Sequence, residues 1–122
     1  MSDSVLLREL PDGGHEFVLE DPVLQSLVID GGVTLRFGRT DVVVRGPCTL
    51  EVDGIGHRLD PRAPESLAPL LSCHPGTARW VWSSVDGRLT VVWMQGQCLV
   101  VPEPLVPCTW SVGGWSAPLR RT

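Results

Sequence analysis

Cysteine and histidine are the residue types in this chain best suited to metal binding or nucleophilic chemistry, and the sequence holds 4 cysteines and 3 histidines. Their spacing matches no C-x-x-C, H-x-x-x-H or H-E-x-x-H motif, so the sequence predicts neither a metal site nor a cofactor. Cys73 is followed directly by His74 and is the one cysteine that we expect to be exposed. No third group can be placed beside this pair to orient a base, so we expect no catalytic residue.

An internal repeat organises the rest of the chain. The segment PCTL at residues 47–50 returns as PCTW at residues 107–110, and an Asp-Gly pair lies upstream of each copy. Asp-Gly between apolar runs is the strongest short signal for a two-residue β-hairpin turn. Short strands with turn signals at this spacing are typical of all-β folds, so we predict a mainly β protein.

We expect a single domain over residues 1–122 that contains two similar units. Residues 23–60 and 79–120 are each predicted to form an antiparallel meander of about five strands. One meander alone would expose its apolar face to water. We therefore expect the two meanders to cover each other in a barrel or a sandwich.

The segment between the repeats, residues 61–78, contains one short predicted helix near residues 64–72. Leu67, Leu70 and Leu71 fall on one face at the spacing of an α-helix. We expect this apolar stripe to cover one end or one face of the β structure.

Two-residue turns determine which side chains face the core, because directly paired residues share a face. In the second repeat, a turn at Asp86-Gly87 pairs Trp82 with Val91. The same register pairs Trp80 with Trp93. The side chains expected to face inward include four tryptophans and three cysteines: Trp80, Trp82, Trp93, Trp110, Cys48, Cys98 and Cys108.

This register leaves an apolar outer face on the second repeat. Where the first repeat carries Arg36 and Arg45 on this face, the second carries Val92 and Val101. Patches of this kind are covered by a helix, a second subunit or a partner. We therefore expect a non-catalytic interaction module that binds another protein, or a second copy of this chain as a homodimer. The residues expected to make this contact are Val81, Val92, Leu99, Val101 and Trp115.

An internal pocket is the alternative to a binding surface. A turn at Asp53-Gly54 pairs His57 with Leu50, which turns His57 toward the core. The predicted registers turn Ser26 and Ser84 inward as well. Small barrels can hold a ligand among such polar side chains. The alternative function is therefore a small-ligand-binding β-barrel, or an enzyme, with a pocket near His57.

Composition and charge narrow the class of partner. The formal net charge is −4, and no basic face is expected, so we predict no nucleic-acid binding. No apolar run approaches the roughly 18 residues of a membrane span, so we predict no membrane contact. The first residues lack the pattern of a signal peptide. We therefore expect reduced thiols and a cytoplasmic location.

The chain resembles a group of small actinobacterial β-rich proteins of unknown function. The shared features are the Asp-Gly hairpins, the segment P-x-x-L-x-P-L-L over residues 64–71 and Trp110. The resemblance covers residues 23–112, although the group's usual Y-E-A-W motif keeps only its tryptophan here. The resemblance implies no known activity. Small acidic proteins of this sort are often suspected to be inhibitors of the immunity or antitoxin type. By that association, we expect this chain to be such an inhibitor.

Overall fold

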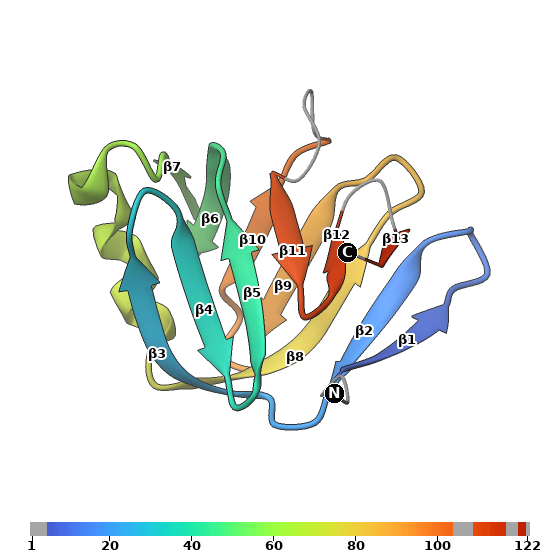
Figure 1. Cartoon of the computed structure of the whole chain (residues 1–122). Coiled ribbons are helices and arrows are strands. Elements are labelled where there is room, and N and C mark those ends of the chain that lie inside the picture. The colour runs from blue at the N-terminus through green and yellow to red at the C-terminus, as the bar shows by residue number, and fades with distance from the viewer. Residues whose placement is uncertain (1–4, 104–108, 117–119, 122) are drawn as a thin grey trace.

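The computed structural model describes residues 5–103, 109–116 and 120–121, and its described part is mainly β (Figure 1). The strands are β1 (Val5–Glu9), β2 (His15–Leu19), β3 (Val23–Ile29), β4 (Val33–Phe37), β5 (Thr40–Val44), β6 (Cys48–Val52), β7 (Ile55–Leu59), β8 (Gly76–Ser83), β9 (Leu89–Trp93), β10 (Cys98–Val101), β11 (Trp110–Val112), β12 (Trp115–Ser116) and β13 (Arg120–Arg121). One 3-10 helix, η1 (Pro64–Cys73), separates β7 from β8.

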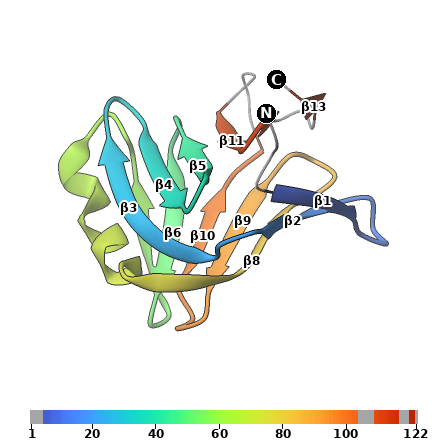
Figure 2. The ribbon, with the colours of Figure 1, turned by 60° about the horizontal axis from the view of Figure 1, so that its bottom comes forward.

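The strands form one continuous antiparallel sheet that folds over into two facing layers (Figures 1 and 2). One layer has the order β13-β12-β11-β5-β4-β3, and the other has the order β8-β9-β10-β6-β7. Strand β8 joins the layers because it pairs with β3 near its start and with β9 along most of its length. Within the described residues no pairing joins β13 to β7, so the sheet is open and a closed barrel is not formed.

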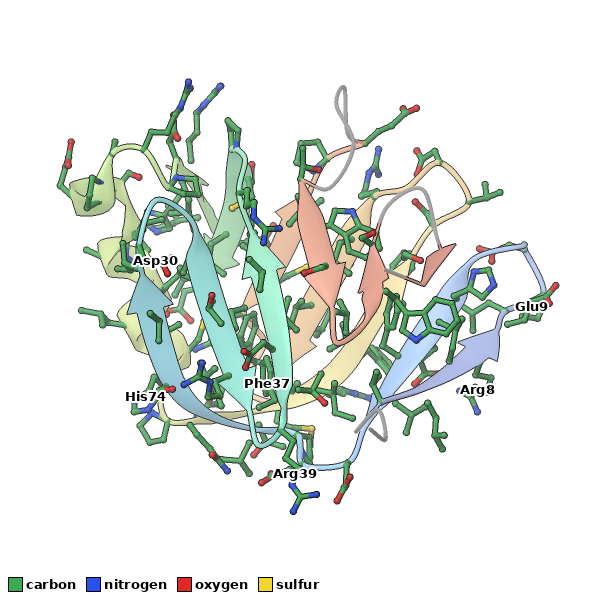
Figure 3. All side chains as sticks on the ribbon, in the orientation of Figure 1. Arg8, Glu9, Asp30, Phe37, Arg39 and His74 are labelled. Carbon is green, nitrogen blue, oxygen red and sulfur yellow. The ribbon has the colours of Figure 1, made fainter. Side chains whose placement is uncertain are left out.

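The core fills the space between the two layers. The Phe37 ring contacts the Trp93 ring across this space, with ring centroids 6.5 Å apart, and Figure 3 shows Phe37 among the side chains there. The Phe17 and Trp110 rings form a second contact, edge to face, at 6.1 Å. All four side chains are buried. Aromatic pairs of this geometry stabilise a core beyond the burial of their area.

The first hairpins of the two predicted repeats share an irregularity in their pairing. Strand pairing between β3 and β4 shifts by one residue between Leu24 and Ser26. Pairing between β8 and β9 shifts in the same way between Ala78 and Trp80. A bulge bends its strand and increases the local twist, so β3 and β8 are bent at equivalent points.

The last hairpin of each repeat is exchanged between the repeats: it pairs with a strand of the other repeat. The β6–β7 hairpin of the first repeat pairs with β10 of the second. The β11–β12 hairpin of the second repeat pairs with β5 of the first. Each layer is therefore built from both repeats, whereas the meander pattern predicts that each repeat keeps its own strands together.

The predicted register of the second repeat is wrong by one residue. The connection between β8 and β9 is a five-residue loop, in which the Ser84 N–H donates to the Arg88 carbonyl at 2.9 Å. This loop pairs Ser83 with Leu89 and Trp82 with Thr90. Because neighbouring side chains in a strand face opposite ways, the shift turns Trp80 and Trp82 outward.

The next turn shifts β10 in the same sense. Four residues connect β9 to β10, with the Trp93 N–H donating to the Gln97 carbonyl at 2.9 Å and Gly96 at a φ of 103°. Leu99 therefore pairs with Val91 in the core, and Cys98 turns to the outer face. The predicted inward position of Cys98 is wrong for this reason.

The first repeat has two wrong registers and one correct register. Its first loop contains three residues, so Ile29 rather than Val28 pairs with Val33, and Ser26 faces outward beside Arg36. A turn at Arg39-Thr40 is expected to pair Leu35 with Val44, but β4 and β5 pair Leu35 with Val42. The Asp53-Gly54 turn is predicted correctly: φ is 53° and 79° at its two residues, as a type I′ turn requires.

The helix between the repeats lies where the sequence predicts it, but as a 3-10 helix. Such a helix has three residues per turn, which aligns Leu67, Leu70 and Cys73 toward the core. Leu71, predicted on the same face, is 69% exposed, and Cys73, predicted to be exposed, is fully buried. The helix packs against β6 and β7. Among the described residues, no helix has the length and apolar character needed to cross a membrane.

Candidate functional site

The outer face of the β8 layer carries two tryptophans side by side on one strand. Trp80 is 47% exposed and Trp82 is half-buried. Cross-strand pairing places Val92 and then Cys98 beside Trp80, and Thr90 beside Trp82. On the other side of β8, Glu16 of β2 pairs directly with Trp82. We define the outer-face patch as Leu6, Val18, Trp80, Trp82, Val92, Cys98 and Val100, whose side chains share this face by register.

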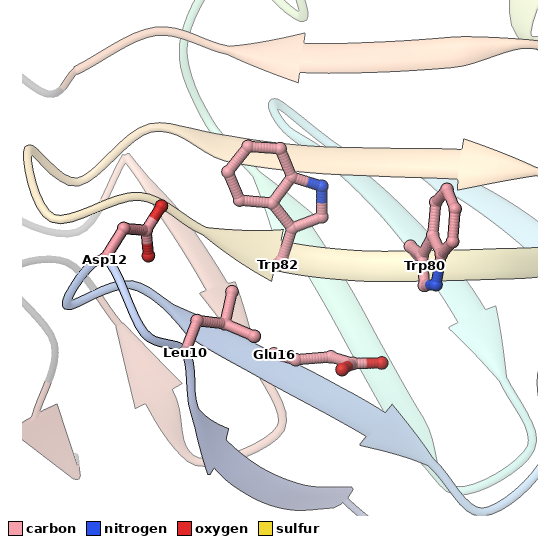
Figure 4. Close-up of a pocket in the computed structure, with 5 residues that line it drawn as sticks. All are labelled: Leu10, Asp12, Glu16, Trp80 and Trp82. Atoms are coloured by element: carbon pink, nitrogen blue, oxygen red, sulfur yellow. The ribbon is translucent and has the colours of Figure 1, made fainter.

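A groove of about 270 Å³ lies on this patch, and Figure 4 shows its lining. The indoles of Trp80 and Trp82 form one wall, and Leu10, Asp12 and Glu16 face them from β2 and the β1–β2 turn. Ring faces bind ligands by stacking and by attracting cations, and carboxylate oxygens accept hydrogen bonds.

A break in strand pairing extends the groove along β8. Strands β2 and β8 are paired at only two rows, His15 with Ser83 and Glu16 with Trp82. Beyond these rows the strands diverge and enclose a second hollow of about 180 Å³, which shares Glu16 and Trp80 with the first. The two hollows are therefore neighbours, and together they follow β8 toward Ala78.

Two arginines lie at the groove. The guanidinium of Arg79 lies over the Trp80 ring, 4.4 Å from its centroid. Arg8, which pairs with Glu16 across β1 and β2, forms an ion pair with that carboxylate. The remaining carboxylate, Asp12, accepts a hydrogen bond from the Gly14 N–H at 2.9 Å, which holds it at the turn.

Three of the five residues predicted to bind a partner lie in the core. Val81 and Val101 are 2% exposed and Leu99 is fully buried, so their predicted outward positions are wrong. The one-residue shift of β8 and β10 is the cause. Val92 lies on the outer face as predicted and is half-buried, and Trp115 is partly buried against the core.

The three predicted pocket residues are not brought together. His57 pairs with Leu50 as predicted and is half-buried on β7. Ser26 is on the outer side of β3, and Ser84 is in the β8–β9 loop, where its hydroxyl donates to the Asp86 carboxylate. This hydrogen bond lowers the pKa of Asp86 below its ordinary value. A third hollow, of about 290 Å³, is lined by Ser84 but by neither Ser26 nor His57.

The three described cysteines are free thiols that are buried or half-buried. Cys48 is in the core as predicted, and Cys108 lies outside the described residues. Burial raises the pKa of the Cys48 thiol to about 12 and that of Cys73 to about 11. Over the described part of the chain, no group of three or more histidine, cysteine, aspartate or glutamate side chains could hold a metal ion.

Thiol labelling should reflect this burial. In the folded protein at pH 8, we expect Cys48 and Cys73 to react with Ellman's reagent at least about a hundredfold more slowly than in denaturant, because the thiolate is the reactive form and both thiols are shielded. Half-buried Cys98 should react first of the three. Mass spectrometry of timed labelling assigns each site, and fast labelling of Cys73 would contradict its buried position.

Comparison with known proteins gives a family and no activity. A family model described as "Family of unknown function (DUF6188)" matches residues 15–118. No curated protein and no solved structure matches the chain. The matched span includes β2, β8 and the strands between them, and therefore most of the groove.

Proposed function

We propose that this chain, which belongs to the DUF6188 family of unknown function, is a non-catalytic module that binds a protein partner through its outer-face patch. The observation that carries the proposal is the pair Trp80 and Trp82 on the outside of β8, where Trp80 leaves nearly half of its surface in water. Tryptophan is the residue type most enriched at the energetic centres of protein interfaces. An indole pair that lines a surface groove fits that role.

The shape of the site favours a macromolecular partner over a small molecule. Small-ligand sites are enclosed pockets of about 300–1,000 Å³ that bury most of the ligand. Here the groove of about 270 Å³ opens onto an apolar face that continues across β1, β2, β9 and β10. An internal ligand pocket near His57 has no such support, because Ser26 and Ser84 lie elsewhere.

An immunity-type inhibitor is the specific form that we propose. The net charge of −4 suits a basic partner, such as a nucleic-acid-cleaving toxin that needs to be neutralised. We further propose that the protein acts in the cytoplasm of an actinobacterium. The resemblance to small actinobacterial proteins and the free cysteines support this setting.

Paired surface variants test the proposal. The double variant Trp80→Ser/Trp82→Ser removes both indoles, and Ile55→Ser removes an apolar side chain that is 62% exposed on β7, away from the groove. We expect a partner that co-purifies from native-host lysate with the parent chain and with Ile55→Ser to be lost from the double variant. With the purified partner, the double variant should bind about thirtyfold or more weakly, the size of a hot-spot loss.

Two controls keep this test interpretable. Circular dichroism and urea unfolding check that each variant folds, and light scattering after size exclusion reports self-association. Equal partner binding by the double variant and the parent would overturn the proposal. A parent dimer that the double variant converts to monomer would identify a second copy of this chain as the partner instead.

A further inference from the structure

We infer that the groove receives an arginine or lysine side chain of the partner, with its cationic head group over Trp82 and between the carboxylates of Asp12 and Glu16. This inference rests on the proposed function and specifies the chemistry of the occupant. It is carried by three observations: an intramolecular example of the same contact, the placement of the two carboxylates, and the charge of the chain.

The protein already binds a guanidinium on one of its two groove indoles. Arg79 covers the Trp80 ring at 4.4 Å, inside the roughly 6 Å range of a cation–π interaction. The second indole, Trp82, lines the same groove from the same strand face. Among the described residues, the cation–π contact lies on Trp80 and not on Trp82, whose half-buried ring lines the groove.

Both carboxylates line the same groove as Trp82, together with the Leu10 side chain. Glu16 is the direct cross-strand partner of Trp82, which puts the two side chains next to each other on one face. Asp12 reaches the groove from the turn before β2 and is oriented by the Gly14 N–H. A cationic head group placed there would donate charge-assisted hydrogen bonds to the carboxylates and contact the face of the Trp82 ring.

Other occupants fit this arrangement less well. A neutral apolar side chain would take water away from Asp12 and Glu16 without replacing its hydrogen bonds, which is unfavourable. An acidic side chain would be repelled by both carboxylates. A basic segment is also attracted over longer range by the net charge of −4.

Arg8 would compete with a cationic ligand for the Glu16 carboxylate, and this competition can be tested. It holds Glu16 in an ion pair, but its own side chain is 67% exposed, whereas that of Glu16 is 17% exposed. Exposed ion pairs contribute little stability, so the pair can open when another cation arrives. Removing Arg8 should therefore strengthen the binding of a cationic ligand, an effect that a merely structural contact between Arg8 and Glu16 would not produce.

The experiment uses two short peptides that differ only in charge. One is acetyl-Gly-Ser-Arg-Ser-Gly-amide, and the other has citrulline, the neutral isostere, in place of arginine. Titrations into the full chain are followed by the five tryptophan indole N–H signals in two-dimensional NMR, assigned with Trp80→Phe and Trp82→Phe. We expect the arginine peptide to shift the Trp82 signal and the citrulline peptide to bind about fivefold more weakly.

Three charge variants sharpen the result. Glu16→Gln should weaken arginine-peptide binding about fivefold, and Arg8→Gln should strengthen it about twofold. Glu51→Gln makes the same charge change at an exposed residue of β6, which β9 and β10 separate from β8, and should leave binding unchanged. Folding of each variant is checked by the dispersion of the same spectra.

Equal binding of the arginine and citrulline peptides would overturn the inference, as would shifts confined to indoles other than Trp82. Weaker binding by Arg8→Gln would also overturn it. None of these results touches the proposed function, which fails only if Trp80→Ser/Trp82→Ser keeps the partner. Conversely, a partner that depends on the tryptophans but not on Glu16 would leave the interaction module in place with an uncharged occupant.

Discussion

Replacing Trp93 with alanine should lower the free energy of unfolding by about 3–5 kcal/mol, the range measured for truncating large buried aromatic side chains. The Trp93 side chain is 1% exposed and packs against Phe37 between the two layers. Truncation would leave a cavity that layers fixed by strand pairing cannot close. Urea unfolding, followed by circular dichroism, measures the loss.

Trp80→Ala is the matched control, because it makes the same substitution in a tryptophan on a neighbouring strand. Trp80 is 47% exposed on the outer face, so its loss should cost under about 1 kcal/mol. The comparison tests the register directly. If both variants lost the same stability, Trp80 would lie in the core, as a two-residue turn between β8 and β9 would place it.

Replacing Gly76 with alanine should lower the free energy of unfolding by about 3 kcal/mol, at the upper end of the usual cost of overpacking. A Cβ atom on this residue would lie 2.4 Å from the Cys73 carbonyl oxygen and 3.1 Å from Cδ1 of Trp93. The first of these atoms belongs to the backbone and cannot rotate away. Thermal and urea unfolding measure the loss.

Gly56→Ala provides the comparison for this second substitution. A Cβ atom at Gly56 would meet only Cγ2 of Thr49, at 3.9 Å, which is an ordinary contact distance. Gly56 is also exposed on β7. We expect its substitution to change stability by under about 0.5 kcal/mol. A similar small change at Gly76 would show that the end of η1 can move away from the start of β8.

Turn signals and alternating strands were sufficient to predict the fold class, because both are local properties of the chain. The Asp53-Gly54 turn needs two residues with positive φ, and its residue types specify that conformation. Asp86-Gly87 has the same two residue types, but it lies in a longer loop. There the Ser84 and Asp86 side chains form hydrogen bonds with each other and with the Arg88 backbone N–H. Loop length, and with it the register, depended on those side-chain bonds.

The groove was missed for the same reason, since one residue of register exchanges the two faces of β8. The sequence from Trp80 to Ser83 does not resolve this choice, because apolar residues occupy both faces. The serine-x-aspartate pair at Ser84 and Asp86 was the available signal for a longer loop. The exchange of the last hairpins could not be predicted locally, because it depends on which strand edge is free after the first hairpins have formed.

The exchange of the last hairpins also bears on how the chain evolved. A hypothetical ancestor with a single repeat would have had no strand to complete its own layer, and would have needed a second chain to supply the last hairpin, as in a domain-swapped dimer. Fusion of two such copies turns a symmetric pair into one molecule whose halves can accumulate mutations separately. The outer face shows this divergence: the positions of Trp80 and Trp82 correspond to Ser26 and Val28 of the first repeat. In a fused chain, the two copies of one position can carry different residues, as Trp80 and Ser26 do.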